Sequence, residues 1–506
     1  MVEITVDGKI FKVKKDALLI EELLAHKINI PHFCYHQSLG KDGNCRMCMV
    51  EIEGKKRPQI ACDTPIKEGM VVRTRGENID KVKRSILELE LINHPVDCPI
   101  CDQAGECKLQ DYYMETGLYD SRLDTVKTHG KKHIDLGCNV MLDQERCVLC
   151  TRCVRFTKNI TKTSELVVIG RADHSVIGTF EDRKLDNPYA MNVVDLCPVG
   201  ALTSKDFRFH QRVWFLKTQE AICDGCAKGC AIYVDHHREK YKDDTIYRYR
   251  PRFNPDVNGY FMCDFGRLGY KKENNSICQS AYIRGKTSEY EYAEGKFARL
   301  LKRHTGKIVF MVSQMLSLEE LFRLKKLAKN CGAKISGYGE VLWDESFGDD
   351  FLKSSDRALN RKAFDILSID VSQEFLSVSL LDAELVVFIR RQDVHTSEAL
   401  GYKGASVFLD AYCYNSIFEG IDLILPIASH TSRDGSFVNV DGYVQYSSCV
   451  IKKNFYAKPL LTLIAQILKD SIFTCRDVWE DGLSQESMLC DIDFDTLSKT
   501  SQKIKL

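Results

Sequence analysis

The chain has 506 residues, enough for roughly three or four domains. Lysine plus arginine equals aspartate plus glutamate at 71 each, so no overall charge favours nucleic acid or an anionic membrane as a partner. The start of the chain has no apolar signal-like core, and no apolar run approaches the roughly 18 residues of a membrane span. We therefore expect no secretory signal, and contact with a membrane only through partner proteins.

The first 75 residues or so are predicted to form a compact α+β unit. Ile4–Phe11 reads as two alternating strands joined by an Asp7-Gly8 turn, which is a strong signal for a hairpin. Leu19–Leu24 carries apolar residues at helical spacing, and a further strand is expected at Met49–Glu53. Between that helix and that strand lies an irregular stretch that contains the first cysteines.

The next part of the chain is predicted to be rich in loops. Ile79–Asn93 has a helical pattern that ends beside His94, and residues 118–145 lack apolar periodicity, so we expect a connecting segment there. Small strands are expected at Val213–Phe215 and Ile232–Val234.

After about Tyr270 the pattern changes to alternating strands and helices. Ser317 followed by Glu320 predicts a capping box at a helix start, and Gly332 predicts the end of that helix. This order argues for a parallel α/β layer. The buried strands are expected at Lys307–Val312, Leu385–Ile389, Ser406–Asp410 and Ile421–Leu425.

Sixteen candidate metal ligands fall into four sets within the first 263 residues. Each set has a close C-x2-C pair plus two other ligands, which suits a metal or cluster better than a disulfide. Many cysteines without a signal peptide also indicate a reducing compartment. In chain order, the four sets have the ligand types of a series of iron–sulfur clusters, and they therefore predict that the protein carries electrons. They are Cys34, Cys45, Cys48 and Cys62; His94, Cys98, Cys101 and Cys107; Cys147, Cys150, Cys153 and Cys197; and Cys223, Cys226, Cys230 and Cys263.

Zinc is the alternative occupant of every set. A [2Fe–2S] centre takes four thiolates, as the first set offers, and Gly40, Gly43 and Asn44 would let the loop wrap it. By chemistry alone the second set, one histidine with three cysteines, would be an ordinary zinc site. The third set has the C-x2-C-x2-C run of bacterial ferredoxins, with Pro198 after its distant fourth ligand. The other cysteines are predicted to be isolated thiols: Cys138, Cys278, Cys331, Cys413, Cys449, Cys475 and Cys490.

Several of these motifs resemble known electron-transfer segments. Cys34-x10-Cys45-Arg-Met-Cys48 resembles the [2Fe–2S] ferredoxin domain of respiratory and hydrogenase subunits. The second set with Ala104-Gly-Glu-Cys-Lys-Leu-Gln-Asp111 resembles the [4Fe–4S] segment, with one histidine and three cysteines, of complex I and iron hydrogenases. The fourth set resembles the N-terminal [4Fe–4S] domain of molybdopterin oxidoreductases.

All four sets, in this order, resemble the family of large iron–sulfur subunits of bacterial NADH–quinone oxidoreductase, which corresponds to the 75 kDa subunit of mitochondrial complex I. The resemblance is strong over residues 1–272 and continues weakly, through a stretch at Asp434–Gln445, into a molybdopterin-oxidoreductase-like region. Two positions depart from that second family, since Phe265 stands where a lysine is common and Tyr443 where an arginine is usual.

The resemblance implies a multidomain fold of α+β and α/β parts. Expected are a [2Fe–2S] ferredoxin-like β-grasp domain at 1–78, a [4Fe–4S] domain with one His and three Cys ligands at 79–118, and a [4Fe–4S] ferredoxin-like domain at 119–215. A molybdopterin-oxidoreductase-type [4Fe–4S] domain at 216–272 and a truncated molybdopterin-oxidoreductase-like α/β domain at 273–506 would follow. One [2Fe–2S] cluster, three [4Fe–4S] clusters and no molybdenum are expected.

The resemblance also implies the function. The chain would relay electrons from the FMN of a partner subunit, which oxidises NADH, towards quinone in a proton-translocating complex, without any catalytic or nucleotide-binding residue of its own. Other peripheral-arm subunits would be its partners, at the cytoplasmic face of the inner membrane. The alternatives are the diaphorase subunit of an NAD-reducing hydrogenase, an iron hydrogenase, a molybdenum formate dehydrogenase, and a zinc-stabilised scaffold without a redox role.

Overall fold

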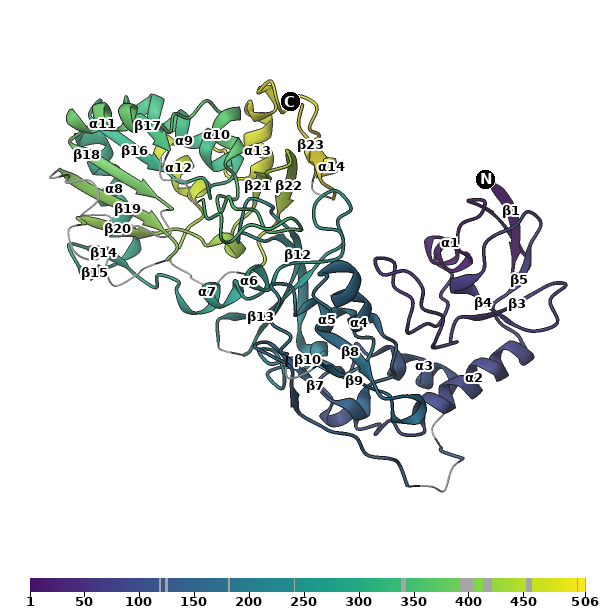
Figure 1. Ribbon diagram of the computed structural model, residues 1–506. Helices are drawn as coiled ribbons and strands as arrows, with labels where there is room; N and C mark the ends of the chain where they lie inside the picture. Colours follow the sequence, from purple (N-terminus) through teal and green to yellow (C-terminus); the bar gives the residue numbers. More distant parts are fainter. Residues whose placement is uncertain are drawn as a thin grey trace. The chain divides into compact units, whose positions relative to one another are not determined.

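The computed structural model divides the chain into two compact units, Met1–Phe215 and Leu216–Leu506, each of which is described by itself (Figure 1). The structure describes residues 1–117, 120–122, 126–180, 183–240, 242–337, 343–390, 402, 404–412, 421–451, 457–497 and 499–505. All sixteen candidate ligands lie within these ranges, whereas Cys413 lies outside them.

The first unit begins with a five-stranded mixed sheet in the order β2-β1-β5-β3-β4. The predicted hairpin is confirmed, and its turn residues Asp7 and Gly8 have φ of 48° and 82°, the left-handed values that a tight hairpin turn requires. Leu19, Ile20 and Leu23 of helix α1 are buried in the core beside this sheet. The elements are β1 (Val2–Val6), β2 (Lys9–Val13), α1 (Leu19–Ala25), β3 (Met49–Ile52), β4 (Gln59–Ile60) and β5 (Val71–Arg73).

The rest of the first unit consists of short elements around loops. The predicted helix before His94 is confirmed as α2, which ends at Leu91. Residues 118–145 are not only a connection, because strands β6 and β7 form there and pair with each other, and β7 also pairs with β10. These elements are α2 (Glu77–Leu91), α3 (Lys108–Thr116), β6 (Ile134–Asp135), β7 (Val140–Leu142), α4 (Arg152–Arg155), β8 (Leu166–Ile169), β9 (Val176–Thr179), α5 (Asn192–Leu196) and β10 (Leu202–Ser204).

The second unit opens with a three-stranded antiparallel sheet made of β11 (Lys217–Ile222), β12 (Ala231–Arg238) and β13 (Asp244–Pro251). The strand expected at Ile232–Val234 is confirmed as part of β12. The prediction of a strand at Val213–Phe215 is wrong, because these residues form a 3-10 turn at the end of the first unit. Their bulky side chains suit a strand locally, but no neighbouring strand pairs with them among the described residues.

A seven-stranded sheet organises the remainder of the second unit, in the order β15-β14-β20-β19-β18-β16-β17. Its last five strands are parallel, which confirms the predicted α/β layer. The capping box of Ser317 and Glu320 and the left-handed Gly332 are also confirmed at the two ends of α9. The strands are β14 (Ala281–Ile283), β15 (Lys286–Ser288), β16 (Ile308–Val312), β17 (Lys334–Gly337), β18 (Leu385–Ile389), β19 (Ala405–Asp410) and β20 (Leu423–Pro426).

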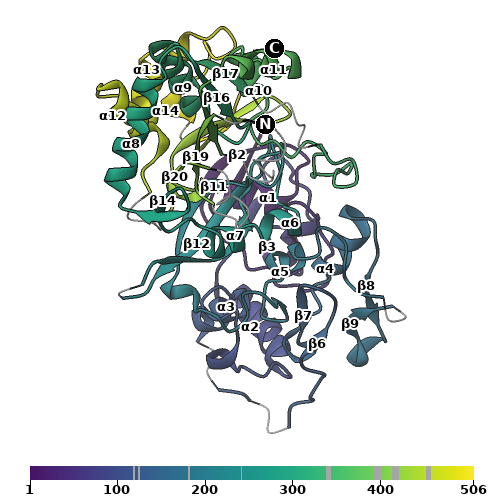
Figure 2. The ribbon, with the colours of Figure 1, turned by 90° about the vertical axis from the view of Figure 1, so that its left-hand side faces the viewer.

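Helices cover this sheet and bury its apolar strands. Helix α8 runs beside β14 and β20 (Figure 2), and α9 packs against β16 and β17. Their apolar faces share one core with Phe310 and Val387, while Val309 and Phe388 point to the opposite face of the sheet. The helices are α8 (Tyr290–Arg303), α9 (Leu318–Cys331), α10 (Lys362–Ile366), α11 (Gln373–Leu381), α12 (Leu460–Leu468) and α13 (Cys475–Glu480).

The cysteines outside the ligand sets are mostly free thiols in the described part of the chain. Cys278 is the exception to the prediction, since it is buried and disulfide-bonded. Sequence spacing alone could not show this, because a disulfide depends on which cysteines the fold brings together. No helix in the described ranges combines the length and apolar character that a membrane span requires.

Candidate metal centres

The first ligand set lies in the loop between α1 and β3 and in the 3-10 turn after β4. All four of its cysteines are buried. The backbone N–H groups of Phe33 and Cys34 donate to Cys45 Sγ at 3.5 and 3.4 Å, and the N–H of Gly43 faces the sulfur of Cys34. The thiols of Cys45 and Cys62 also donate to Cys34, which holds its pKa below the usual range. The four sulfurs therefore form one group inside a shell of backbone donors.

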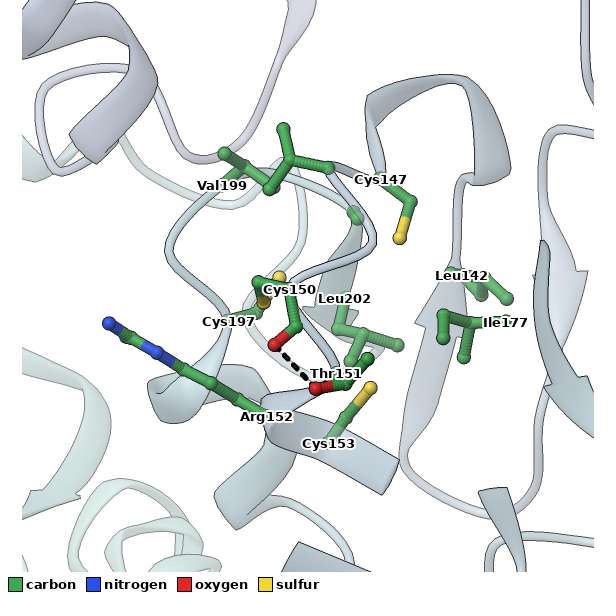
Figure 3. A pocket seen from close by; sticks show the side chains of 12 residues that line it. Leu142, Cys147, Cys150, Thr151, Arg152, Cys153, Ile177, Cys197, Val199 and Leu202 are labelled. Carbon is green, nitrogen blue, oxygen red and sulfur yellow. Dashed lines mark hydrogen bonds between the residues drawn. The ribbon is translucent and has the colours of Figure 1, made fainter. Parts of the chain in front are cut away.

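The third ligand set surrounds a small cavity (Figure 3). Cys147, Cys150, Cys153 and Cys197 line it, and their sulfurs point inward while the Arg152 side chain points away. The rest of the wall is apolar and comes from β7, β9 and β10 through Leu142, Ile177 and Leu202, with Val148, Val199 and Ala201 beside them. Burial raises the pKa of Cys150 to about 12. A bound metal would have to hold these sulfurs as thiolates, because burial alone favours the neutral thiol.

The second ligand set follows α2. Cys101 and Cys107 are buried, and a negative charge on Cys101 would raise the pKa of Cys107, as one on Cys98 would raise that of Cys101. Cys107 stands directly before α3. His94 lies three residues after the last helical residue of α2, and burial lowers its pKa to about 4. It is therefore neutral near pH 7, and neutral imidazole is the form that binds metals.

The fourth ligand set lies in the second unit, on the β11–β12 connection and at the start of helix α6 (Asp264–Arg267). Its cysteines are buried and act on one another electrostatically. The N–H of Gly225 donates to Cys223 Sγ at 3.4 Å, and that of Gly266 to Cys263 Sγ at 3.3 Å. A Cβ atom at Gly266 would lie 2.7 Å from Cys223 Sγ, so glycine is needed for this close approach.

The ligand turns hold their backbones in unusual conformations. Arg46, Val96, Leu149 and Thr151 have φ between 46° and 59°, the left-handed region that residues with side chains rarely adopt, and the fourth set has Gly229 at 58°. For the β-branched Val96 this is a marked outlier. Strain of this kind persists where the surrounding structure requires it and gathers at functional sites.

The third set is joined to the first by two arginines of α4. Arg152 donates from Nη2 to the carbonyl of Tyr35 at 2.6 Å, and Arg155 donates to the carbonyl of Cys34. Arg155 Nη1 also reaches the carbonyls of Leu39 and Gly40 at 3.1 and 3.0 Å. Two further bonds join the loops, from Asn44 Nδ2 to the Leu149 carbonyl and from Thr151 Oγ1 to Asp42.

The third set is joined to the second on another side. Arg146, directly before Cys147, donates to both carboxylate oxygens of Asp97, directly before Cys98, at 3.0 and 2.6 Å. Gly200 packs so closely on Cys101 that a Cβ atom there would lie 2.3 Å from the sulfur. The third set therefore contacts both the first and the second set, although it follows both along the chain.

The cavity of the third ligand set suits a cluster better than a single ion. Among the residues that the structure describes, no group of three or more His, Cys, Asp or Glu side chains is placed to hold one metal ion. Zinc draws its four ligands to about 2.0–2.3 Å from one point, whereas an iron–sulfur cluster spreads its thiolates around several atoms. Sulfurs that face a shared cavity, as in the third set, suit that larger group.

The sequence predicts the cysteine ligands but does not reveal the residues that connect the sets. Arg146, Arg152, Arg155 and Gly200 all stand within three residues of a ligand, and this adjacency was the available signal. Their partners lie far away in sequence, up to 121 residues for Arg155 and Cys34, so spacing could not reveal the contacts.

Three family models match the first unit. The one described as a 2Fe-2S iron-sulfur cluster binding domain covers residues 1–77, and the NADH-ubiquinone oxidoreductase-G iron-sulfur binding region covers residues 83–122. The ferredoxin-like domain of NADH-quinone oxidoreductase subunit 3 covers residues 137–203. Each match contains one complete ligand set, so the first unit consists of iron–sulfur cluster-binding domains.

Curated relatives share one identity, the G subunit of NADH-quinone oxidoreductase or its 75 kDa equivalent. The G subunit of Rickettsia conorii is 34% identical over 338 residues, 66% of this chain and 50% of that protein. Over this stretch the chain is similar to the G subunit. That of Streptomyces coelicolor is 34% identical over 65% of this chain and 39% of its own length. The NADH-ubiquinone oxidoreductase 75 kDa subunit of Reclinomonas americana is 36% identical over 66% and 48%.

The chain thus spans about half or less of the length of the curated relatives it matches. A solved NAD+-reducing [NiFe]-hydrogenase is 31% identical over 42% of this chain and 91% of that chain, with a TM-score of 0.38. That score is too low for the shared shape to carry an argument.

Proposed function

We propose that this chain is an iron–sulfur electron-transfer subunit of a proton-translocating NADH:quinone oxidoreductase. The sixteen ligands would hold one [2Fe–2S] cluster in the first set and [4Fe–4S] clusters in the other three. When bound, such clusters take up and release single electrons. The observation that carries the proposal is the junction of three largely buried ligand sets within one unit, each set inside a matching iron–sulfur domain.

The contacts between the sets favour a route in the order first, third, second. Arg152 and Arg155 fix the first loop against α4, while Arg146 and Gly200 fix the second loop against the third. Ligand loops that are fixed against one another suit electron transfer, because the loops do not have to move for an electron to pass between the centres. The residues of this chain hold, space and desolvate the centres, and none is required as an acid, base or nucleophile.

The remaining chemistry would belong to partners. A flavin-bearing subunit would oxidise NADH on its FMN, and other peripheral-arm subunits would pass the electrons to quinone. The α/β part of the second unit would dock the chain into the complex as a truncated molybdopterin-oxidoreductase-like domain without molybdenum. The complex would lie at the cytoplasmic face of the inner membrane, where this chain meets the membrane only through its partners.

Metal analysis and reconstitution test the proposal. Anaerobically purified protein should contain about fourteen iron atoms per chain, with matching acid-labile sulfide. It should not oxidise NADH or formate alone, and should gain NADH-linked electron transfer when the flavin subunit is added. Stoichiometric zinc with little iron, or one molybdenum per chain, would contradict the proposal. Co-purification with nickel–iron hydrogenase subunits would favour the diaphorase alternative.

A further inference from the structure

Arg152 occupies a buried position between two ligand sets. It stands between Cys150 and Cys153 in the third set, and its side chain extends away from their cavity (Figure 3). Its guanidinium donates to the carbonyl of Leu196, directly before Cys197, at 3.2 Å. On the other side it donates to the carbonyl of Tyr35, directly after Cys34, at 2.6 Å. One cation therefore touches the backbone of both the first and the third set.

The charge of Arg152 has an unusual environment. The residue is 8% exposed, and its Nε has no hydrogen-bond partner within the described ranges. Its other guanidinium nitrogens donate to carbonyl dipoles, and Cys150 and Cys197 are the groups that would stabilise its charge most strongly once they bind metal as thiolates. A buried cation is costly unless an opposite charge compensates it. Thiolate-ligated clusters would supply that opposite charge.

Two neighbouring arginines are compensated differently. Arg146 forms an ion pair with Asp97, so its charge is largely neutralised locally. Arg155 is only half-buried, and the carbonyls it contacts on the far side belong to the first-set loop. Arg152 is thus the buried arginine of this group that contacts two sets and has no carboxylate among its hydrogen-bond partners in the described ranges.

We infer that Arg152 is a shared counter-charge that raises the reduction potentials of both the first and the third centre. The inference rests on the proposed function, because it requires clusters in both sets. Reduction adds one negative charge to a centre, and a nearby fixed cation stabilises the reduced form. Because the same cation faces both sets, it would shift the two potentials in the same direction. Arg152 acts through the centres as a positioning and tuning residue.

EPR-monitored redox titration of the purified complex tests the inference. Arg152→Gln should lower the midpoint potentials of the first and the third centre, each by at least a tenfold change in the reduction equilibrium, which is about 59 mV for one electron. The second centre should keep its potential. Arg152→Lys retains the charge and should restore most of both shifts, although it loses one of the two carbonyl contacts; a purely structural role would not give this rescue.

The outcomes separate the inference from the proposed function. Absence of cluster signals in the unmodified complex would contradict the function itself. Normal signals with an unchanged potential at either centre in Arg152→Gln would overturn only the inference. If Arg152→Gln lost its clusters, Arg152→Met, which also removes the charge, would take its place in the titration. A fall of both potentials would support the inference, and unchanged potentials would overturn the charge argument.

Discussion

Arg146 and Asp97 form a largely buried ion pair in which both carboxylate oxygens accept from the same guanidinium, at 3.0 and 2.6 Å. Each residue directly precedes a cysteine ligand, Cys147 in one case and Cys98 in the other. A bidentate pair fixes both distance and angle, so it sets the placement of one ligand loop against the next. The spacing of the second and third centres therefore depends on side chains that bind no metal.

Arg146→Gln should destabilise the first unit by about 2–3 kcal/mol, because it leaves the Asp97 carboxylate without its main partner. Burial alone would raise the pKa of Asp97, but the bond with Arg146 and the charge of Lys132 bring it below the ordinary value. The pair therefore contributes fully at pH 7 and is lost as pH falls below about 4. The midpoint of urea-induced loss of iron–sulfur absorbance would measure the effect.

The matched control is Lys205→Gln in the same unit. Lys205 pairs with the exposed carboxylate of Asp135 at 2.7 Å, and exposed pairs contribute about 0–1 kcal/mol. If Arg146→Gln lowered the free energy of unfolding no more than Lys205→Gln does, the buried pair would not hold the two loops together.

Gly200→Ala should damage the second centre more than the third. The new Cβ atom would lie 2.3 Å from Cys101 Sγ and 3.1 Å from Gln103 Cβ, so the ligand loop of the second set has to shift. Iron content and the EPR signal of the second centre would measure this. Gly130→Ala, where the nearest atom is 3.4 Å away, is the control, and an equal loss in both variants would contradict the close-packing argument.

Local patterns predicted much of this fold. The Asp7-Gly8 turn and the Ser317 capping box are confirmed, because each depends on residues close together in sequence, and the parallel strands are confirmed because each carries its own local run of apolar residues. The strand expected at Val213–Phe215 failed because pairing needs a neighbour that a local pattern cannot show. Spacing in the sequence predicts the four ligand sets, and that assignment stays a prediction. The contacts between the sets could not be predicted, because they join residues such as Arg155 and Cys34, 121 residues apart.

His94→Cys should retain a cluster in the second set but lower its reduction potential. A neutral imidazole replaced by thiolate adds negative charge to the centre and disfavours uptake of an electron. Burial lowers the pKa of His94 to about 4, so the wild-type ligand stays neutral from about pH 6 to 8. EPR-monitored titration would measure the shift, and an unchanged potential would argue that His94 binds no cluster.

Glu90→Gln should raise the free energy of unfolding of the first unit at about pH 8, and should raise it less at about pH 5.5. Burial raises the pKa of Glu90 to about 7, although its side chain is half-exposed. A carboxyl with a raised folded pKa makes stability fall as pH rises from its unfolded value, near about 4.3, towards 7. After allowance for solvent screening we expect a gain of about 1 kcal/mol at the higher pH. Urea midpoints at the two pH values would measure it, and a gain confined to the lower pH would have the wrong sign.

Cys226→Ser should weaken folding or assembly more than electron flow. The fourth set lies in the second unit, whereas the other three lie in the first. Two residues after its last ligand, Phe265 stands where a lysine is common in the molybdopterin oxidoreductases that this set resembles. The binding energy of a structural metal centre is also folding energy, so loss of one ligand should lower the yield of assembled complex. Complex that does assemble should keep NADH-to-quinone turnover near that of the unmodified enzyme. Cys449→Ser, at a cysteine of the same unit that lies outside the ligand sets, is the control for the loss of a cysteine. Full assembly with severely reduced turnover would instead place the fourth centre on the main electron route.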